Sequence, residues 1–184
     1  MEIYSPEQDS FLLAKILKKE IKQLIVSNPN LKVLDIGSGS GIQAKTAIDA
    51  GANPENITLS DINSEAIKHL KKNFTKSKII KSNLFEKIKT KFNLIVFNPP
   101  YLPEDKFDKE KDTTGGKKGD EIIIKFLKQA KNHFTYNGKA LLLTSSLTPM
   151  KIINTLLKKY NYNSKLLEKK KIFFEELKVW ELSL

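Results

Sequence analysis

The 184-residue sequence contains no cysteine and no arginine. Without cysteine the chain cannot form a disulfide, a thiolate metal site or a cysteine nucleophile, and this composition fits a cytoplasmic protein. The sequence also lacks a run of about 18 apolar residues, so no membrane-spanning helix is expected. Its N-terminus has no basic region followed by an apolar stretch, and no signal peptide is expected. The two histidines, His69 and His133, have no metal-ligand spacing around them, so no metal site is expected either.

All 32 basic residues are lysines, and the chain carries a net charge of +11. A lysine-rich surface attracts polyanions such as RNA in a salt-dependent way. Arginine, however, is the side chain that usually reads guanine or phosphate with two hydrogen bonds, and here it is missing. The charge is therefore interpreted mainly as a solvated surface, and a nucleic-acid substrate is not expected from it.

The spacing of apolar residues predicts helices and strands in alternation. The first helix is expected to be capped by Ser5, with Pro6 in its first turn and Gln8 closing a capping box, and to end at Asn28. Further helices are predicted at about 41–50, 64–74, 120–134 and 149–160, and strands at about 32–37, 57–61, 78–81, 92–97, 140–144, 165–174 and 178–182.

This order of elements predicts an α/β fold. Alternating strands and helices imply a mainly parallel, Rossmann-like sheet of seven strands with helices on both faces. The last two strands have no helix between them, so they are expected to form an antiparallel C-terminal hairpin. The sequence shows no internal repeat and no linker. Residues 1–184 are therefore expected to form one domain, with the N-terminal helical segment 1–30 packed on it.

A glycine-rich turn follows the first predicted strand. The turn contains Asp35, Gly37, Gly39 and Gly41. Glycines at a strand-to-helix turn let the backbone approach a ligand that a Cβ would block. A dinucleotide fingerprint requires its third glycine one residue later, where this chain has Ile42. The acid before the first glycine would repel a pyrophosphate and would favour a cationic amine or sulfonium. The pattern resembles motif I of class I methyltransferases, which implies S-adenosylmethionine as cofactor, and the alternative is a tight turn without a ligand.

Two further strand ends supply candidate cofactor contacts. Asp61 follows the second predicted strand and is expected to accept hydrogen bonds from both ribose hydroxyls, with a helix N-cap as its alternative role. Ile62 is expected to pack on the adenine ring. After the third strand, the side-chain oxygen of Asn83 can accept from the adenine 6-amino group while Leu84 covers the ring. Taken alone, this last segment is also typical of an ordinary strand end.

The fourth predicted strand ends in the candidate catalytic residues Asn98, Pro99, Pro100 and Tyr101. Consecutive prolines fix two φ angles and hold the preceding residue in an extended conformation. The Asn98 side-chain oxygen and the Pro99 carbonyl are therefore expected to be fixed acceptors at the carboxyl end of the sheet, where α/β proteins bind ligands.

Two fixed acceptors suit a planar nitrogen that carries two N–H donors. They can hold both hydrogens and favour the pyramidal nitrogen that must attack a methyl group. The ring of Tyr101 can stack on the planar acceptor. The tetrapeptide resembles motif IV of the amino-methyltransferases that act on adenine, cytosine or glutamine nitrogen, and the combined motifs imply the class I methyltransferase fold.

Other segments resemble one particular family of amino-methyltransferases. The opening Tyr4-Ser5-Pro6-Glu7-Gln8-Asp9-Ser10-Phe11-Leu12-Leu13 resembles the (V/I)Y-x-P-x-E-D-(S/T)-F-L-L start of the short archaeal and eukaryotic branch of the HemK/PrmC family, although Gln8 stands where an acid is common. The segment Gly115-Gly116-Lys117-Lys118-Gly119 and the ending at 171–179 are similar to the same branch. Bacterial members add an N-terminal helical domain, for which no room is expected before Asp35.

The resemblance implies a protein glutamine N5-methyltransferase that modifies the Gly-Gly-Gln motif of a class 1 release factor. It places Ser10 near the cofactor, together with Asp35, Gly37, Asp61, Asn98 and residues 83 and 84. Family members usually have Asp at position 83, and Asn83 departs from that pattern. Many of them also form a heterodimer with a small zinc-binding activator protein.

Three other functions stay open from the sequence. An N6-adenine methyltransferase of DNA or RNA shares the Asn-Pro-Pro-Tyr site but usually carries a target-recognition segment. A lysine methyltransferase would need a base that the motif does not offer. A non-catalytic cofactor-binding subunit is disfavoured because the motif is intact.

Overall fold

The computed structural model describes residues 2–101 and 119–184. Within these residues the chain forms a seven-stranded sheet in the order β3-β2-β1-β4-β5-β7-β6. The strands are β1 (Val33–Ile36), β2 (Ile57–Asp61), β3 (Lys78–Lys81), β4 (Phe92–Phe97), β5 (Phe134–Ser145), β6 (Asn163–Ile172) and β7 (Glu175–Ser183). The helices are α1 (Gln8–Ser27), α2 (Ile42–Asp49), α3 (Ser64–Asn73), α4 (Glu121–Ala130) and α5 (Met150–Lys159), with 3-10 turns η1 (Pro54–Asn56) and η2 (Lys131–His133).

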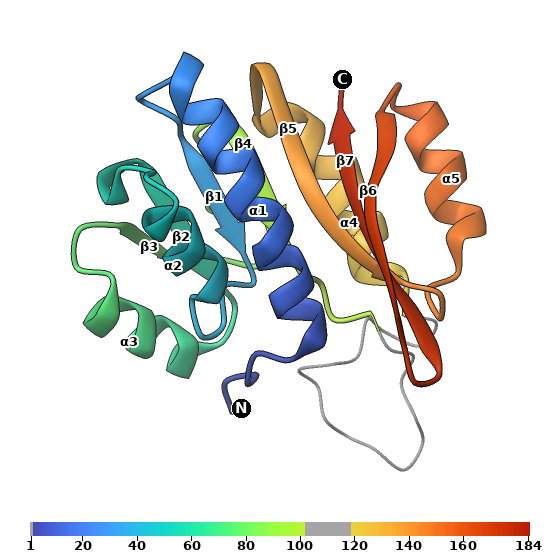
Figure 1. Cartoon of the computed structure of the whole chain (residues 1–184), viewed down its shortest axis with the longest axis horizontal. Helices are drawn as coiled ribbons and strands as arrows, with labels where there is room; N and C mark the ends of the chain where they lie inside the picture. Colours follow the sequence, from blue (N-terminus) through green and yellow to red (C-terminus); the bar gives the residue numbers. More distant parts are fainter. Residues whose placement is uncertain (1, 102–118) are drawn as a thin grey trace.

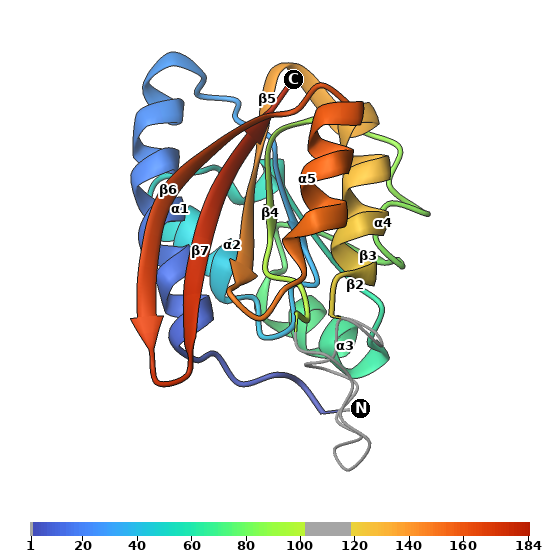
Figure 2. The ribbon, with the colours of Figure 1, turned by 90° about the vertical axis from the view of Figure 1, so that its right-hand side faces the viewer.

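Strands β1 to β5 are parallel, and β7 pairs antiparallel with both β5 and β6. The predicted fold class is therefore confirmed: an α/β fold with a mainly parallel seven-stranded sheet and an antiparallel C-terminal hairpin. The helices lie on both faces of the sheet, with α1 and α2 on one side and α4 and α5 on the other (Figures 1 and 2).

Alternate residues of the central strands pack in two separate hydrophobic cores. Leu94 and Val96 of β4 pack in the core that includes the apolar side of α1, whereas Ile95 and Phe97 pack in the core beneath α4 and α5. Period-two alternation along a strand requires this division, and β4 is apolar on both faces because helices cover both. Every helix among the described residues is too short or too polar to cross a lipid bilayer.

The predicted capping box at the N-terminus is wrong. Helix α1 begins at Gln8 with Glu7 as its N-cap, and no side chain caps it. Pro6 therefore lies before the helix, in a segment without regular secondary structure. This segment is held instead by Tyr4, whose hydroxyl donates to the Asp9 carboxylate at 3.2 Å. A side-chain hydrogen bond across five residues thus holds this segment, in place of the predicted capping box.

Three boundaries near the C-terminal half also differ from prediction. The predicted helix 120–134 ends at Ala130, and β5 already begins at Phe134, well before the predicted residue 140. The predicted strand 165–174 ends at Ile172, because Phe173 and Phe174 form the turn of the β6–β7 hairpin. The predicted loop 102–118, with Gly115 to Lys118 of the family segment, lies outside the described residues.

Candidate active site

The glycine turn after β1 has the backbone that its sequence predicts. Gly37, Gly39 and Gly41 have φ angles of +64°, +50° and +82°, a region that side chains with a Cβ rarely enter. A Cβ on Gly41 would lie 2.4 Å from the Phe74 ring, whereas a Cβ on Gly39 would meet no atom closer than 4.0 Å. Gly41 is therefore required for packing, and Gly39 leaves open backbone at the carboxyl end of β1.

Ser38 fixes the turn to the neighbouring strand. Its backbone N–H donates to the Ser60 carbonyl at 3.0 Å, and its hydroxyl donates to the Asp35 carbonyl at 2.9 Å. The Ser60 N–H donates back to the Ser38 hydroxyl at 3.1 Å. Sequence reasoning does not single out Ser38, because a serine between two glycines carries no signal of such a cross-strand contact.

Asp61 at the end of β2 is tied directly to the glycine turn. Its Oδ2 accepts from the Gly39 N–H and its Oδ1 from the Asn63 N–H, both at 2.8 Å. Helix α3 is capped by Asn63, whose side chain accepts from the Glu65 N–H, so the alternative role of Asp61 as the helix cap is wrong. The carboxylate is oriented by two backbone donors and retains lone pairs for further donors.

Asp35 is a buried carboxyl group at the base of the turn. Its exposed fraction is 2%, and its Oδ2 has no hydrogen-bond partner among the described residues. Burial raises the pKa of Asp35 from 3.8 to about 7, against the effect of a hydrogen bond from the Ala44 backbone. A cation placed near Oδ2 would relieve this cost.

Replacing Asp35 by asparagine is expected to stabilise the ligand-free protein at pH 8 by about 2 kcal/mol, or roughly 4–8 °C in Tm. Because the pKa of Asp35 is higher in the folded than in the unfolded protein, its contribution to stability is fully present below about pH 4. That contribution is lost as the pH rises to about 7. Asparagine stays neutral throughout. The measurement is the thermal unfolding of wild type and Asp35→Asn at pH 5 and pH 8. An equal Tm difference between the two proteins at both pH values would refute the prediction.

The Asn98 side chain, after β4, is held by residues of α1. Its Nδ2 donates to the Asp9 Oδ2 at 3.0 Å, with a second contact of 3.4 Å to the Ser10 hydroxyl. A carboxylate only accepts hydrogen bonds, so it fixes which end of the amide faces it. The Asn98 Oδ1 therefore points away from Asp9, and this buried oxygen has no partner among the described residues.

Asp9 is itself buried and oriented by its neighbours. It is 5% exposed, and its Oδ1 accepts from the Ser10 N–H at 2.5 Å and from the Tyr4 hydroxyl. The Ser10 carbonyl in turn accepts from the Gln43 side chain at 3.0 Å, which joins α1 to α2. Sequence reasoning places Ser10 near the site but assigns no role to Asp9. The position of Asp9 in the opening motif is the sequence feature that could have indicated a role for it.

Tyr101 lies beside Asp9 at the edge of the described chain. It is half-buried and packs against the core on the α1 side of the sheet. Burial raises the pKa of its hydroxyl, and the nearby Asp9 carboxylate raises it further. Its hydroxyl therefore stays protonated at physiological pH and cannot serve as a general base. Pro99 is buried and Pro100 half-buried, and neither lies in a helix or strand.

The residues predicted to contact adenine lie at the neighbouring strand ends. Ile62 is 58% exposed, which is a large apolar surface for the end of a buried strand. The Asn83 Nδ2 donates to Glu86 at 2.8 Å, so its Oδ1 is the end of the amide that remains to accept. Leu84 is buried with a φ of +47°. The strands thus bring the predicted residues from Asp35 to Tyr101 to one edge of the sheet, and Ser10 reaches Asn98 from α1.

The profile of a family described as methyltransferase small domain matches residues 7–174, which include every predicted site residue from Ser10 to Tyr101. The chain belongs to this family. The match confirms the predicted methyltransferase assignment from the motifs at Asp35 and Asn98.

Similar proteins agree with the predicted HemK/PrmC branch. A Methanocaldococcus jannaschii protein with the provisional name protein N5-glutamine methyltransferase is 35% identical over 98% of this chain and 93% of its own length. The release factor glutamine methyltransferase of Lactococcus lactis is 32% identical over 66% of this chain, but the match spans only 51% of that longer protein.

Solved structures share the fold of this methyltransferase. The E. cuniculi Mtq2–Trm112 complex, described as responsible for methylation of the termination factor eRF1, matches with a TM-score of 0.76 at 23% identity, over 99% of this chain and 98% of that one. The T. thermophilus 16S rRNA N2 G1207 methyltransferase, solved with AdoMet and guanosine, has a TM-score of 0.65 at 19% identity, over 96% of this chain and 43% of that one.

Proposed function

We propose that this methyltransferase binds S-adenosylmethionine and transfers its methyl group to the side-chain amide nitrogen of a protein glutamine. The observation that carries the proposal is the Asn98 Oδ1, a buried acceptor without a partner among the described residues. An unsatisfied buried oxygen costs about 1–3 kcal/mol, and a bound N–H donor would remove that cost.

The cofactor fits the residues at the ends of β1, β2 and β3. Gly39 leaves room for a ligand at the backbone, and Asp61 offers an oriented carboxylate for the ribose hydroxyls. The unpaired Oδ2 of Asp35 suits the positive charge of the methionine portion. Ile62, Leu84 and the oxygen of Asn83 suit the adenine. When bound, the cofactor supplies an electrophilic methyl group on a sulfonium sulfur.

The chain's own residues then orient the acceptor. The Asn98 Oδ1 and the Pro99 carbonyl each accept one N–H of the substrate amide, which directs the nitrogen lone pair toward the methyl carbon. The Tyr101 ring stacks on the amide plane. A bound cofactor would supply the methyl carbon for the new N–C bond and keep the electrons of the broken S–C bond, and the amide would lose one proton to water. Asp9 keeps the Asn98 oxygen facing the substrate throughout.

A glutamine in a class 1 release factor is the proposed substrate. The names of the M. jannaschii and L. lactis relatives support the glutamine, and the L. lactis name supports the release factor. A Gly-Gly-Gln loop also suits a narrow site, because its glycines avoid backbone clashes. By analogy with the E. cuniculi complex, we propose that a small zinc-binding activator forms a heterodimer with this chain.

The test is to incubate the protein, alone and with the activator from the same source, with cofactor and the cognate release factor. Mass spectrometry is expected to show a gain of one methyl mass on the glutamine of the Gly-Gly-Gln motif, abolished by a Gln→Ala change in that substrate. Oligonucleotides are expected to remain unlabelled even at low salt, where electrostatic attraction is strongest. Methylated adenine beside an unmodified release factor would refute the proposal.

A further inference from the structure

Two consecutive aromatic side chains are exposed at the turn of the β6–β7 hairpin. Phe173 and Phe174 are 95% and 98% exposed, although a hairpin turn is usually built from small or polar residues. The turn projects past the end of the sheet at which the parallel strands finish, and the N-terminal segment lies at the same end (Figures 1 and 2). Large apolar side chains that are exposed to solvent next to each other indicate an interaction surface.

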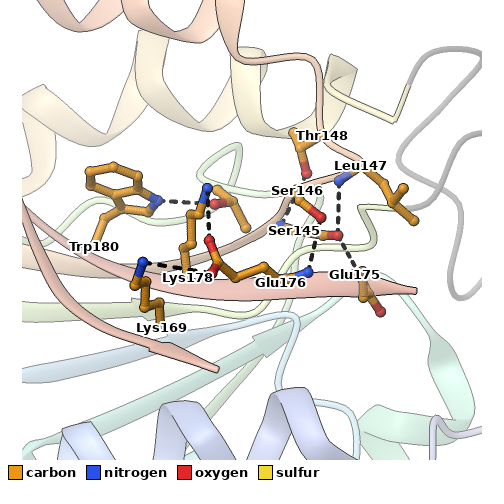
Figure 3. A network of polar contacts seen from close by, with 10 residues as sticks. Ser145, Ser146, Leu147, Thr148, Lys169, Glu175, Glu176, Lys178 and Trp180 are labelled. Atoms are coloured by element: carbon orange, nitrogen blue, oxygen red, sulfur yellow. Dashed lines mark hydrogen bonds and ion pairs between the residues drawn. The ribbon is translucent and has the colours of Figure 1, made fainter. Parts of the chain in front are cut away.

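The hairpin is fixed firmly to the rest of the molecule just behind these side chains. Glu176 and Ser146 form two hydrogen bonds. The Glu176 N–H donates to the Ser146 hydroxyl at 2.9 Å, and the Ser146 N–H donates to the Glu176 carbonyl at 2.9 Å. The Ser145 hydroxyl donates to the Glu175 carboxylate, as Figure 3 shows. On the other strand, Lys170 donates to Gln8 of α1 at 2.6 Å. The exposed pair therefore stands on a preorganised support, which lowers the entropy cost of binding a partner.

The turn borders the candidate active site. A cavity of about 430 Å³ lies between the hairpin and the N-terminal segment. Its walls are Tyr4, Glu7, Gln8, Asp9, Tyr101, Ile172, Phe173 and Glu175. Asp9, which orients Asn98, and Phe173 thus line the same hollow, so a chain bound over Phe173 would run on toward the reacting group.

The charge of this hollow differs from that of the whole molecule. Glu7, Asp9 and Glu175 line it, in a chain whose net charge is +11. Carboxylates in a partly enclosed wall repel phosphates, so a nucleic acid is disfavoured there. A polypeptide without acidic residues, bearing an apolar side chain, complements both the carboxylates and the phenylalanines.

We propose that Phe173 and Phe174 dock the polypeptide flanking the methyl-accepting glutamine, as a substrate-binding element outside the reacting site. This inference rests on the proposed glutamine methylation. The docked segment carries an apolar side chain that packs on the two rings, and no acidic residue. The hairpin thereby sets the affinity for the protein substrate, while Asn98 and its neighbours set the rate of the chemical step.

The test is the double variant Phe173→Ala/Phe174→Ala, assayed with the cognate release factor. The kcat/KM for the release factor is expected to fall about tenfold or more, as for loss of an aromatic hot spot, through a higher KM. The kcat at saturation and the cofactor affinity should stay within about twofold. Because both side chains are exposed, Tm should not change. The matched control is Tyr136→Ala, which removes a 100% exposed aromatic side chain near the start of β5 and should leave kcat/KM unchanged.

Each other outcome is decisive. If wild type methylates the release factor and the double variant does so with the same kcat/KM, the docking role is wrong while the proposed function stands. If the double variant instead loses only its association with the activator, the turn belongs to the heterodimer interface and the inference is overturned. If wild type methylates no protein, the proposed function and this inference fail together.

Discussion

Replacing Asn98 by alanine is expected to lower kcat about a hundredfold or more, the usual cost of losing one preorganised contact to the transition state. Cofactor affinity should change by only a few-fold, because the glycine turn, Asp61 and the end of β3 stay in place. The side chain is held by Asp9 and leaves its oxygen unpaired within the described structure, so its main contribution is to an incoming donor.

Single-turnover methylation and calorimetric titration with the cofactor separate the two effects. A variant that binds cofactor normally and turns over slowly supports the orienting role of Asn98. Near wild-type kcat would refute that role, and loss of cofactor binding would move Asn98 from substrate orientation to cofactor binding.

Asp9→Asn is expected to lower kcat by a similar factor, about a hundredfold, without touching the reacting atoms. The oxygen of the introduced amide would keep the contacts from the Ser10 N–H and the Tyr4 hydroxyl, and its NH₂ group would then face the NH₂ group of Asn98. Two donors repel, so the Asn98 amide turns over and presents its nitrogen to the substrate in place of its oxygen.

Two further variants check that Asp9 acts through Asn98. Asp9→Ala removes the anchor without forcing the amide to turn, so it should be less damaging than Asp9→Asn. In the double variant Asp9→Asn/Asn98→Ala the loss should equal that of Asn98→Ala alone, because groups that act as one unit are not additive. If the kcat losses of Asp9→Asn and Asn98→Ala instead multiply in the double variant, Asp9 has an independent role.

Four of the five parallel strands can be predicted closely from the sequence, whereas β5 begins six residues before its predicted start. The strands 57–61, 78–81 and 92–97 occur at the predicted residues, because each has aliphatic residues at adjacent or alternate positions between polar or turn-forming residues. Asp35, Asp61 and Asn98 meet at one edge because parallel strands carry their carboxyl ends to the same side. Their positions follow from topology alone.

The remaining features cannot be predicted from local sequence patterns. Asp9 and Asn98 are 89 positions apart, and no local pattern relates a carboxylate on the first helix to an amide after the fourth strand. The predicted start of α1 is also wrong: no side chain caps the helix, and the segment before it is held by the hydrogen bond from Tyr4 to Asp9. The sequence predicts a strand at Phe173, where the structure has a hairpin turn, because aromatic residues favour strands by propensity.

The sheet order has a consequence for how the chain is completed during synthesis. Strand β7 leaves the ribosome after β6, yet it lies between β5 and β6 in the finished sheet. Strand β6 therefore has no neighbour in the sheet until β7 has emerged, and β5 keeps one open edge for the same period. The parallel strands can assemble vectorially as they appear. Strand β6 joins the sheet through β7, so the hairpin carrying Phe173 and Phe174 is put in place later than the parallel strands.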